Sequence, residues 1–287
     1  MKHHQKITII MILIILICLV LLHYKLTYSC VQDKNKWYLD QDEILSYQKE
    51  NDSKTHYKTH YLFWTGGLDS TFRLCQIVLD QKEKVQPIYI LCRDLDSESP
   101  AVQRKNRQME IKTMKKIRSR LHLEHPKTKS LILPTMYVTG VQRDLEVLKD
   151  YQTLRKEYGH FPSRTITQYE RIARFSLHFN HSHFNHSHFN HRIEVGLEKC
   201  GTGLDRATND KRTSPGVECI LRDKVDKPFR IFSQLKFPMA HLTKKDYLEI
   251  SRQNGYYQYL QITWSCWYPT ASGRSCGKCD MCKKRII

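Results

Sequence analysis

The chain has 287 residues and a formal net charge of +18, with 40% hydrophobic and 26% charged residues. This hydrophobic content supports a packed core and excludes a chain that is disordered throughout. The length fits one large domain with short additions, and the positive charge favours anionic partners such as nucleotides, nucleic acid or acidic lipid headgroups. Composition alone does not choose among these partners.

The N-terminal region contains an apolar run over residues 7–22, broken only by Thr8 and flanked by lysines. We interpret residues 1–28 as an uncleaved, single-pass membrane anchor, because the run nears the lower end of a spanning length and no small-residue cleavage site follows it. A cleaved signal peptide is the competing interpretation. The predicted localisation is therefore the membrane, with the main domain in the cytoplasm, where ATP and reduced thiolates are found.

Residues 29–58 are polar and run into a tandem repeat of Lys-Thr-His-Tyr, which is typical of a linker. We expect the folded domain to occupy residues 59–287. Within it, apolar runs alternate with stretches of helical periodicity. The predicted strands cover residues 61–65, 86–92, 130–138, 192–197 and 229–232, and the predicted helices cover residues 70–80, 104–120, 166–177 and 243–254. This alternation predicts an α/β fold with a parallel sheet flanked by helices.

Two further segments each allow two interpretations. The dense lysines and arginines of residues 104–120 are typical of the solvated face of a helix, and a nucleic-acid groove is the alternative. Residues 178–191 repeat Ser-His-Phe-Asn-His, which we interpret as an expansion at a helix end or surface loop. Metal binding by these histidines is the alternative, but no cysteine or carboxylate joins them.

Four cysteines near the C-terminus follow the spacing C-x9-C-x2-C-x2-C, and they are Cys266, Cys276, Cys279 and Cys282. This spacing lets one Zn²⁺ collect four thiolates into a tetrahedron, so we predict a zinc-binding segment over residues 262–285. Two disulfides, or four unrelated thiols, are the alternatives. A site closed by four sulfurs is structural, because no position remains for water or substrate.

Residues 65–71 read Thr-Gly-Gly-Leu-Asp-Ser-Thr and fall where a strand is expected to turn into a helix. Backbone amides and the positive end of the helix dipole favour an anion at such a turn, and the glycines permit close approach of an oligophosphate. We predict that Ser70 and Thr71 supply hydroxyl donors and that Asp69 orients the loop or engages Mg²⁺. An ordinary glycine turn with a helix cap is the alternative.

The loop resembles the SGGxDS motif of the PP-loop ATP pyrophosphatases, with Thr65 in place of the first serine. Residues 263–266 (TWSC) and the following CGxCxxC are similar to the 7-cyano-7-deazaguanine synthases of queuosine-precursor biosynthesis, and the resemblance extends over residues 60–287. It implies an ATP-dependent carbon–nitrogen ligase that joins 7-carboxy-7-deazaguanine and ammonia to form 7-cyano-7-deazaguanine through an adenylated carboxylate.

The resemblance also implies the site. Asp69 and Ser70 are the expected catalytic residues, Lys244 or Lys245 is a candidate for pyrophosphate, and the cofactors are ATP, Mg²⁺ and structural zinc. The expected nucleotide-binding residues are Thr65, Gly66, Gly67, Leu68, Asp69, Ser70, Thr71 and Arg164. Arg164 lies in Pro-Ser-Arg-Thr, where the family has Pro-Gly-Arg-Asn, and the family's Pro-Asp-Cys-Arg segment has no counterpart.

Two other functions stay open at this point. One is a PP-loop enzyme that modifies tRNA, which the net charge suits. The other is a membrane-anchored, zinc-stabilised protein that binds ATP without turnover. The expected partners are a deazapurine acid and ammonia, with tRNA, the membrane and a second copy of the chain as further candidates.

Overall fold

In the computed structural model, residues 36–47, 58–91, 105–141, 143–157, 168–183, 192–199 and 226–287 are described. They form a six-stranded sheet in the order β1-β4-β3-β2-β5-β6. The strands are β1 (Lys36–Leu39), β2 (Thr59–Phe63), β3 (Lys84–Ile90), β4 (Met136–Gly140), β5 (Ile193–Val195) and β6 (Leu235–Lys236). Strand β1 pairs antiparallel with β4, and the other pairs are parallel. The predicted α/β fold is confirmed.

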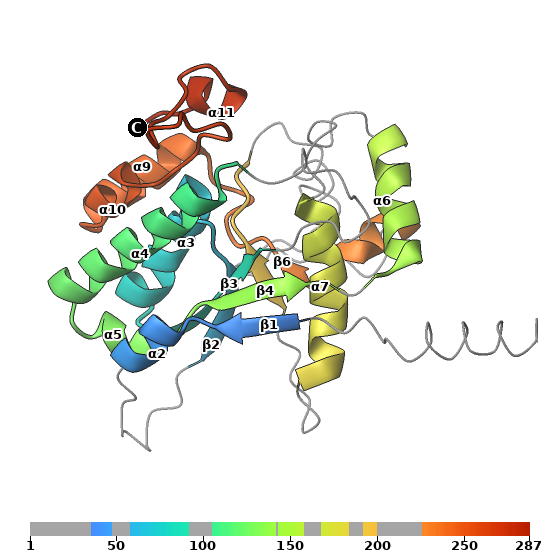
Figure 1. The fold of residues 1–287 in the computed structure, drawn as a ribbon, viewed down its shortest axis with the longest axis horizontal. Helices are drawn as coiled ribbons and strands as arrows, with labels where there is room; N and C mark the ends of the chain where they lie inside the picture. The colour runs from blue at the N-terminus through green and yellow to red at the C-terminus, as the bar shows by residue number, and fades with distance from the viewer. Residues whose placement is uncertain are drawn as a thin grey trace, which may run out of the picture. The chain divides into compact units, whose positions relative to one another are not determined.

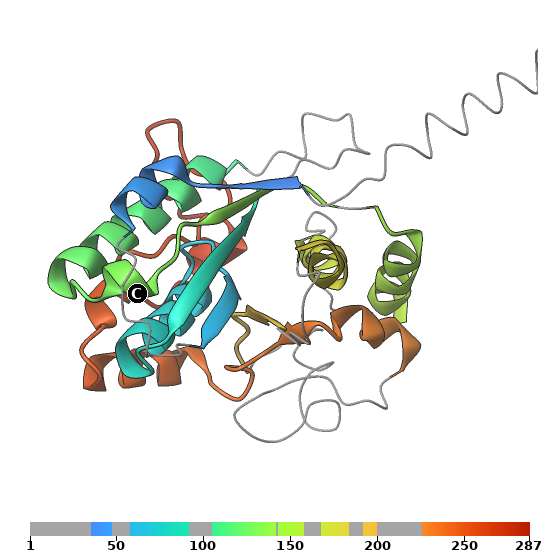
Figure 2. The same ribbon diagram turned by 90° about the horizontal axis from the view of Figure 1, so that it is seen from below.

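Helices cover both faces of this sheet (Figures 1 and 2). One face carries α3 (Leu68–Cys75), the π-helical turn η1 (Gln76–Asp80), α4 (Arg107–Glu124), α5 (Thr128–Leu131), α9 (Lys244–Gln253) and α10 (Tyr257–Gln261). The other face carries α6 (Leu145–Glu157), α7 (Gln168–His183) and the 3-10 helix η3 (Lys227–Phe232). The short helices α2 (Gln41–Ser46) and α11 (Asp280–Lys283) lie near the two ends of the described chain.

The strand residues alternate between two apolar cores. Leu62 and Trp64 pack into the core beneath α3 and α4, whereas Phe63 packs into the core beneath α7. Successive side chains of a strand point to opposite faces, so a short apolar run buried on both sides is expected for an inner parallel strand. This arrangement holds β2 at the centre of the sheet and fixes the loop that follows it.

A buried ionic network joins α3 to the sheet. Glu194 of β5 accepts hydrogen bonds from Arg73 Nε (2.7 Å) and Nη2 (3.2 Å), and its Oε1 lies 2.7 Å from His60 Nδ1 of β2. Glu83 contacts the other ring nitrogen of His60. Burial opposes ionisation of Glu194, but its bonds to His60 and the charge of Arg73 lower its pKa to about 2. The Glu194 carboxylate is therefore charged, and both of its oxygen atoms have partners inside the protein.

Two predictions about secondary structure are wrong. Residues 36–46, within the expected linker 29–58, form β1 and α2, and Arg118 Nη2 contacts Glu43 Oε2 at 3.0 Å to fasten α2 to the body of the domain. Residues 229–232 lie in η3 and do not form a strand, because Pro228 starts a helical turn that buries Phe229 and Phe232 together. The edge strand β6 follows instead.

The prediction of a single-pass membrane protein is corrected. No helix of the described ranges is long and apolar enough to cross a membrane. The longest of them, α4, spans 18 residues but carries many lysines and arginines, whereas a span needs about 20 mostly apolar residues. Residues 1–28, on which the anchor was predicted, lie outside the described residues.

Candidate functional site

The predicted anion-binding loop, residues 65–71, joins the carboxyl end of β2 to the start of α3, as expected. Gly66 adopts a φ of +69°, a conformation that side chains with a Cβ rarely adopt. A Cβ at Gly66 would also lie 3.2 Å from Glu110 O, Met114 Cγ and Thr113 Cγ2 of α4. Both the backbone conformation and the close packing therefore require glycine at this position.

Hydrogen bonds within the loop shape it around the first turn of α3. Ser70 Oγ lies 3.4 Å from the Thr65 N–H, which donates to it, and 3.4 Å from Gly67 O, to which it donates. The Thr71 N–H donates to Gly67 O at 3.0 Å. Thr71 is fully buried, and its hydroxyl accepts a hydrogen bond from Trp64 Nε1 at 3.1 Å. The Thr71 hydroxyl thus stabilises the loop from inside.

Asp69 lies in the first turn of α3, where the helix dipole favours negative charge. The residue is partly exposed, but its Oδ1 is shielded from solvent and has no hydrogen-bond partner among the described residues. Burial raises the pKa of Asp69 to about 7, an effect that Lys244 opposes and Glu198 reinforces. An unsatisfied buried carboxylate oxygen is costly, which is a reason to expect a cationic or donor ligand there.

Lys244 and Glu198 form an ion pair beside this carboxylate. Lys244 Nζ, at the start of α9, lies 2.8 Å from Glu198 Oε1, just beyond β5. Glu198 was not predicted, because nothing in the sequence relates it to α9. The pair holds one lysine charge near Asp69, whereas Lys245 is exposed.

Gly196, which directly follows β5, is a second residue that sequence reasoning missed. A Cβ there would lie 2.8 Å from Ser70 N and 2.9 Å from the carbonyl carbon of Asp69. These contacts are with backbone, so a larger residue would displace the start of α3. The glycine at the end of a short apolar strand was the only sequence signal for this close approach.

The C-terminal segment contacts the loop directly. The Trp264 N–H donates to Gly66 O at 2.9 Å, and Trp264 O would lie 3.7 Å from a Cβ at Gly67. The two motifs, which are about 200 residues apart in the sequence, are therefore in direct contact.

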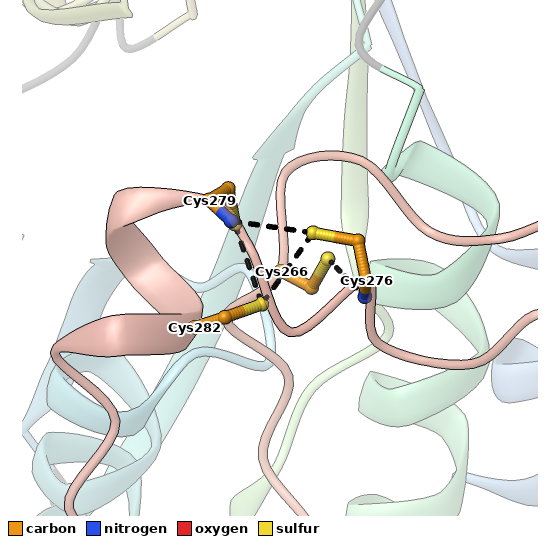
Figure 3. A group of neighbouring side chains, drawn as sticks. All are labelled: Cys266, Cys276, Cys279 and Cys282. Carbon is orange, nitrogen blue, oxygen red and sulfur yellow. Dashed lines mark hydrogen bonds between the residues drawn. The ribbon is translucent and has the colours of Figure 1, made fainter.

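The four predicted zinc ligands converge on one point (Figure 3). Their sulfur atoms all lie within 4.8 Å of one another, with Cys276 Sγ and Cys282 Sγ 3.8 Å apart and Cys279 Sγ and Cys282 Sγ 3.3 Å apart. Zinc–sulfur distances of about 2.3 Å in a tetrahedron separate the sulfurs by about 3.8 Å, so the group fits one Zn²⁺. Disulfides are excluded for these cysteines, because a bonded pair lies at about 2.05 Å and all four thiols are free.

Backbone amides support this cluster. The N–H groups of Lys278 and Cys279 donate to Cys276 Sγ at 3.4 Å, and the Cys276 N–H donates to Cys266 Sγ at 3.3 Å. Burial opposes ionisation of Cys282, but hydrogen bonds from Ser275 and the neighbouring cysteines lower its pKa to about 6. Thiolates are the ligands that zinc requires, so these bonds favour metal binding.

One predicted site residue lies outside this description. Arg164, which was expected to contact nucleotide or substrate, falls between α6 and α7 in residues that the structure does not describe. The histidine-rich repeat is described only as far as His183, where it continues α7.

By its fold and side-chain clusters, the chain is an α/β protein with a glycine-rich loop after the central strand and a four-cysteine site that can hold zinc. Residues 224–286 match the family described as queuosine biosynthesis protein QueC. Over these residues the chain is similar to that family, which confirms the resemblance of its C-terminal region.

Comparison with curated proteins gives no match. Among solved structures, the chain is similar to a protein of Methanocaldococcus jannaschii described as a predicted subunit of tRNA methyltransferase. The identity is 10%, the alignment covers 68% of this chain and 74% of the other, and the TM-score is 0.31. At this TM-score and identity, the similarity does not indicate a shared function.

Proposed function

We propose that this chain is an ATP-dependent carbon–nitrogen ligase, which converts 7-carboxy-7-deazaguanine and ammonia into 7-cyano-7-deazaguanine. The observation that carries the proposal is the hydrogen bond from the Trp264 N–H to Gly66 O. It joins the segment that matches the queuosine biosynthesis family to the glycine-rich loop. The proposed synthase domain extends beyond the predicted residues 59–287 to include β1 and α2, because residues 35–287 form one compact unit.

In the proposed reaction, residues 65–71 bind the pyrophosphate part of ATP. The amides at the start of α3 face the developing negative charge, and Lys244 adds a positive charge nearby. Mg²⁺, when bound, would neutralise phosphate charge, and Asp69 is the residue placed to hold it. Thr65 through Thr71 and Arg164 are the proposed nucleotide-binding residues, and Asp69 and Ser70 are the proposed catalytic residues.

The substrate carboxylate oxygen attacks the α phosphorus of ATP, and pyrophosphate leaves as the bond between the α phosphorus and the bridging oxygen breaks. Ammonia then attacks the carboxyl carbon and displaces AMP, which gives an amide. The amide oxygen attacks a second ATP in the same way, and loss of AMP with protons from the nitrogen gives the nitrile. In this scheme the protein orients the reactants and supplies no nucleophile of its own.

The test is mass spectrometry of the products after incubation of the full chain with ATP, Mg²⁺, ammonia and a panel of deazapurine acids. We expect a nitrile only from the 7-carboxy compound, with AMP and pyrophosphate formed alongside it. Cleavage of ATP that depends on none of the acids, or nucleotide bound but never cleaved, would contradict the proposed acceptor.

A further inference from the structure

Gly66 contacts two other parts of the chain, which are α4 and the segment before the cysteine cluster. On one side, atoms of Glu110, Thr113 and Met114 would lie only 3.2 Å from a Cβ at this position. From the C-terminal segment, Trp264 donates its backbone N–H to the Gly66 carbonyl. The conformation of the loop thus depends on where Trp264 lies.

Trp264 is tied in turn to the cysteine cluster. Its indole Nε1 donates to Cys266 O at 2.8 Å, which folds the tryptophan onto the first of the four cysteines. Cys266 is 1% exposed, and its sulfur accepts the Cys276 N–H. Only Ser265 therefore lies between a predicted metal-ligating cysteine and the residue whose backbone N–H bonds the loop.

The cluster region has no apolar core of its own to hold this arrangement. None of residues 267–286 is buried, and Tyr268 is 49% exposed. Among the described residues, its other contacts with the body of the domain include the hydrogen bond from Arg285 Nη2 to Thr263 O at 3.2 Å and the packing of Ile287 against the apolar core. A segment of this kind depends on its metal for a fixed structure.

We infer that Trp264 is a positioning residue through which the four-cysteine site holds the glycine-rich loop, so that metal loading sets the affinity of the loop for ATP. The part concerning affinity rests on the proposed function. The positional part does not, because it concerns only the order of residues 65–71. The cluster does no chemistry, but loss of its metal releases Trp264 and with it the Gly66 carbonyl.

Hydrogen exchange followed by mass spectrometry tests the positional part on the full chain, with zinc bound and after removal of zinc by a chelator. We expect the amides of residues 65–71 to exchange at least tenfold faster without zinc, while peptides from β3 exchange at an unchanged rate. Equal loop exchange in the two states would overturn the inference, as would equal acceleration of β3, which would indicate general unfolding.

Two matched variants distinguish the effect of the Trp264 side chain from that of a neighbouring tryptophan. Trp264→Phe keeps an aromatic ring and the backbone N–H but removes the bond to Cys266 O, whereas Trp267→Phe makes the same change in a half-buried neighbour for which the structure gives no hydrogen bond. Both should bind one zinc per chain. Loop exchange should be about fivefold faster in Trp264→Phe, as expected for one lost hydrogen bond, and unchanged in Trp267→Phe. Equal rates in the two variants would contradict the role of Trp264.

A binding measurement with a non-hydrolysable ATP analogue then tests the affinity. Binding to the zinc-loaded chain that weakens at least tenfold on zinc removal supports the inference. Equal affinity in both states would overturn it and leave the proposed function standing. Absence of binding to the loaded chain would contradict the proposed function and the affinity part, while the exchange result would still decide the positional part.

Discussion

Replacement of Asp69 by asparagine is expected to slow acceptor-dependent release of pyrophosphate by about a hundredfold or more. The Asp69 carboxylate lies in the glycine-rich loop, and its buried Oδ1 has no hydrogen-bond partner among the described residues. Asparagine removes the charge of this side chain while keeping its shape. The measurement is a coupled pyrophosphate assay at saturating ATP. Glu249→Gln, which neutralises an exposed carboxylate on α9, is the matched control and should retain full activity.

The raised pKa of Asp69 allows this loss of activity to be distinguished from a loss of stability. Because its folded pKa, about 7, exceeds the unfolded value near 3.9, the folded state binds the extra proton and loses stability as pH rises between these values. Asp69→Asn removes that penalty, so the variant should be at least as stable as the parent at pH 7. Wild-type activity should rise as pH increases through about 7. An Asp69→Asn variant with undiminished turnover would contradict the assigned role.

Replacement of Glu194 by glutamine is expected to destabilise the fold by about 3–5 kcal/mol, the cost of breaking a buried ion pair by removing one partner. The change leaves Arg73 inside the protein without its carboxylate and removes one of the two carboxylates that contact His60. Urea unfolding at pH 7 measures the loss. The control is again Glu249→Gln, because surface charges contribute little.

The pH dependence gives a second test of Glu194. Its folded pKa of about 2 lies below the unfolded value near 4.3, so its contribution is fully present above about pH 4.3 and is lost as pH falls toward 2. The difference in stability between the parent and Glu194→Gln should therefore shrink across this interval. A difference below about 1 kcal/mol at pH 7 would show that the network contributes little.

The local patterns of the sequence predicted the parts of the fold that depend on neighbouring residues. The apolar run before Gly66 gave β2, the periodicity after it gave α3, and the spacing of the cysteines gave their convergence. Strand β1 could not be found in this way, because its pairing with β4 joins residues about 100 positions apart and its own sequence is only four residues long. The aromatic residues before Ser233 were misassigned because a short apolar run fits a buried strand as well as a buried helical turn.

The sequence indicated candidate residues for the site but not the contacts between them. The residue types of the 65–71 loop indicated an anion site, and Lys244 was a candidate beside it. Its partner Glu198 and the approach of Gly196 depend on tertiary packing that no spacing reveals. The hydrogen bond from Trp264 to Gly66 is of the same kind, and it relates the cysteine cluster to the loop.

In the proposed function, the glycine-rich loop holds the pyrophosphate of ATP while the bond at the α phosphorus breaks. The most direct measurement uses ATP labelled at the α phosphate, incubated with the zinc-loaded chain, Mg²⁺, 7-carboxy-7-deazaguanine and ammonia, with separation of the labelled nucleotides. We predict that the label appears in AMP and that its appearance depends on the acid. Label in ADP, or in unchanged ATP under these conditions, would contradict the claim.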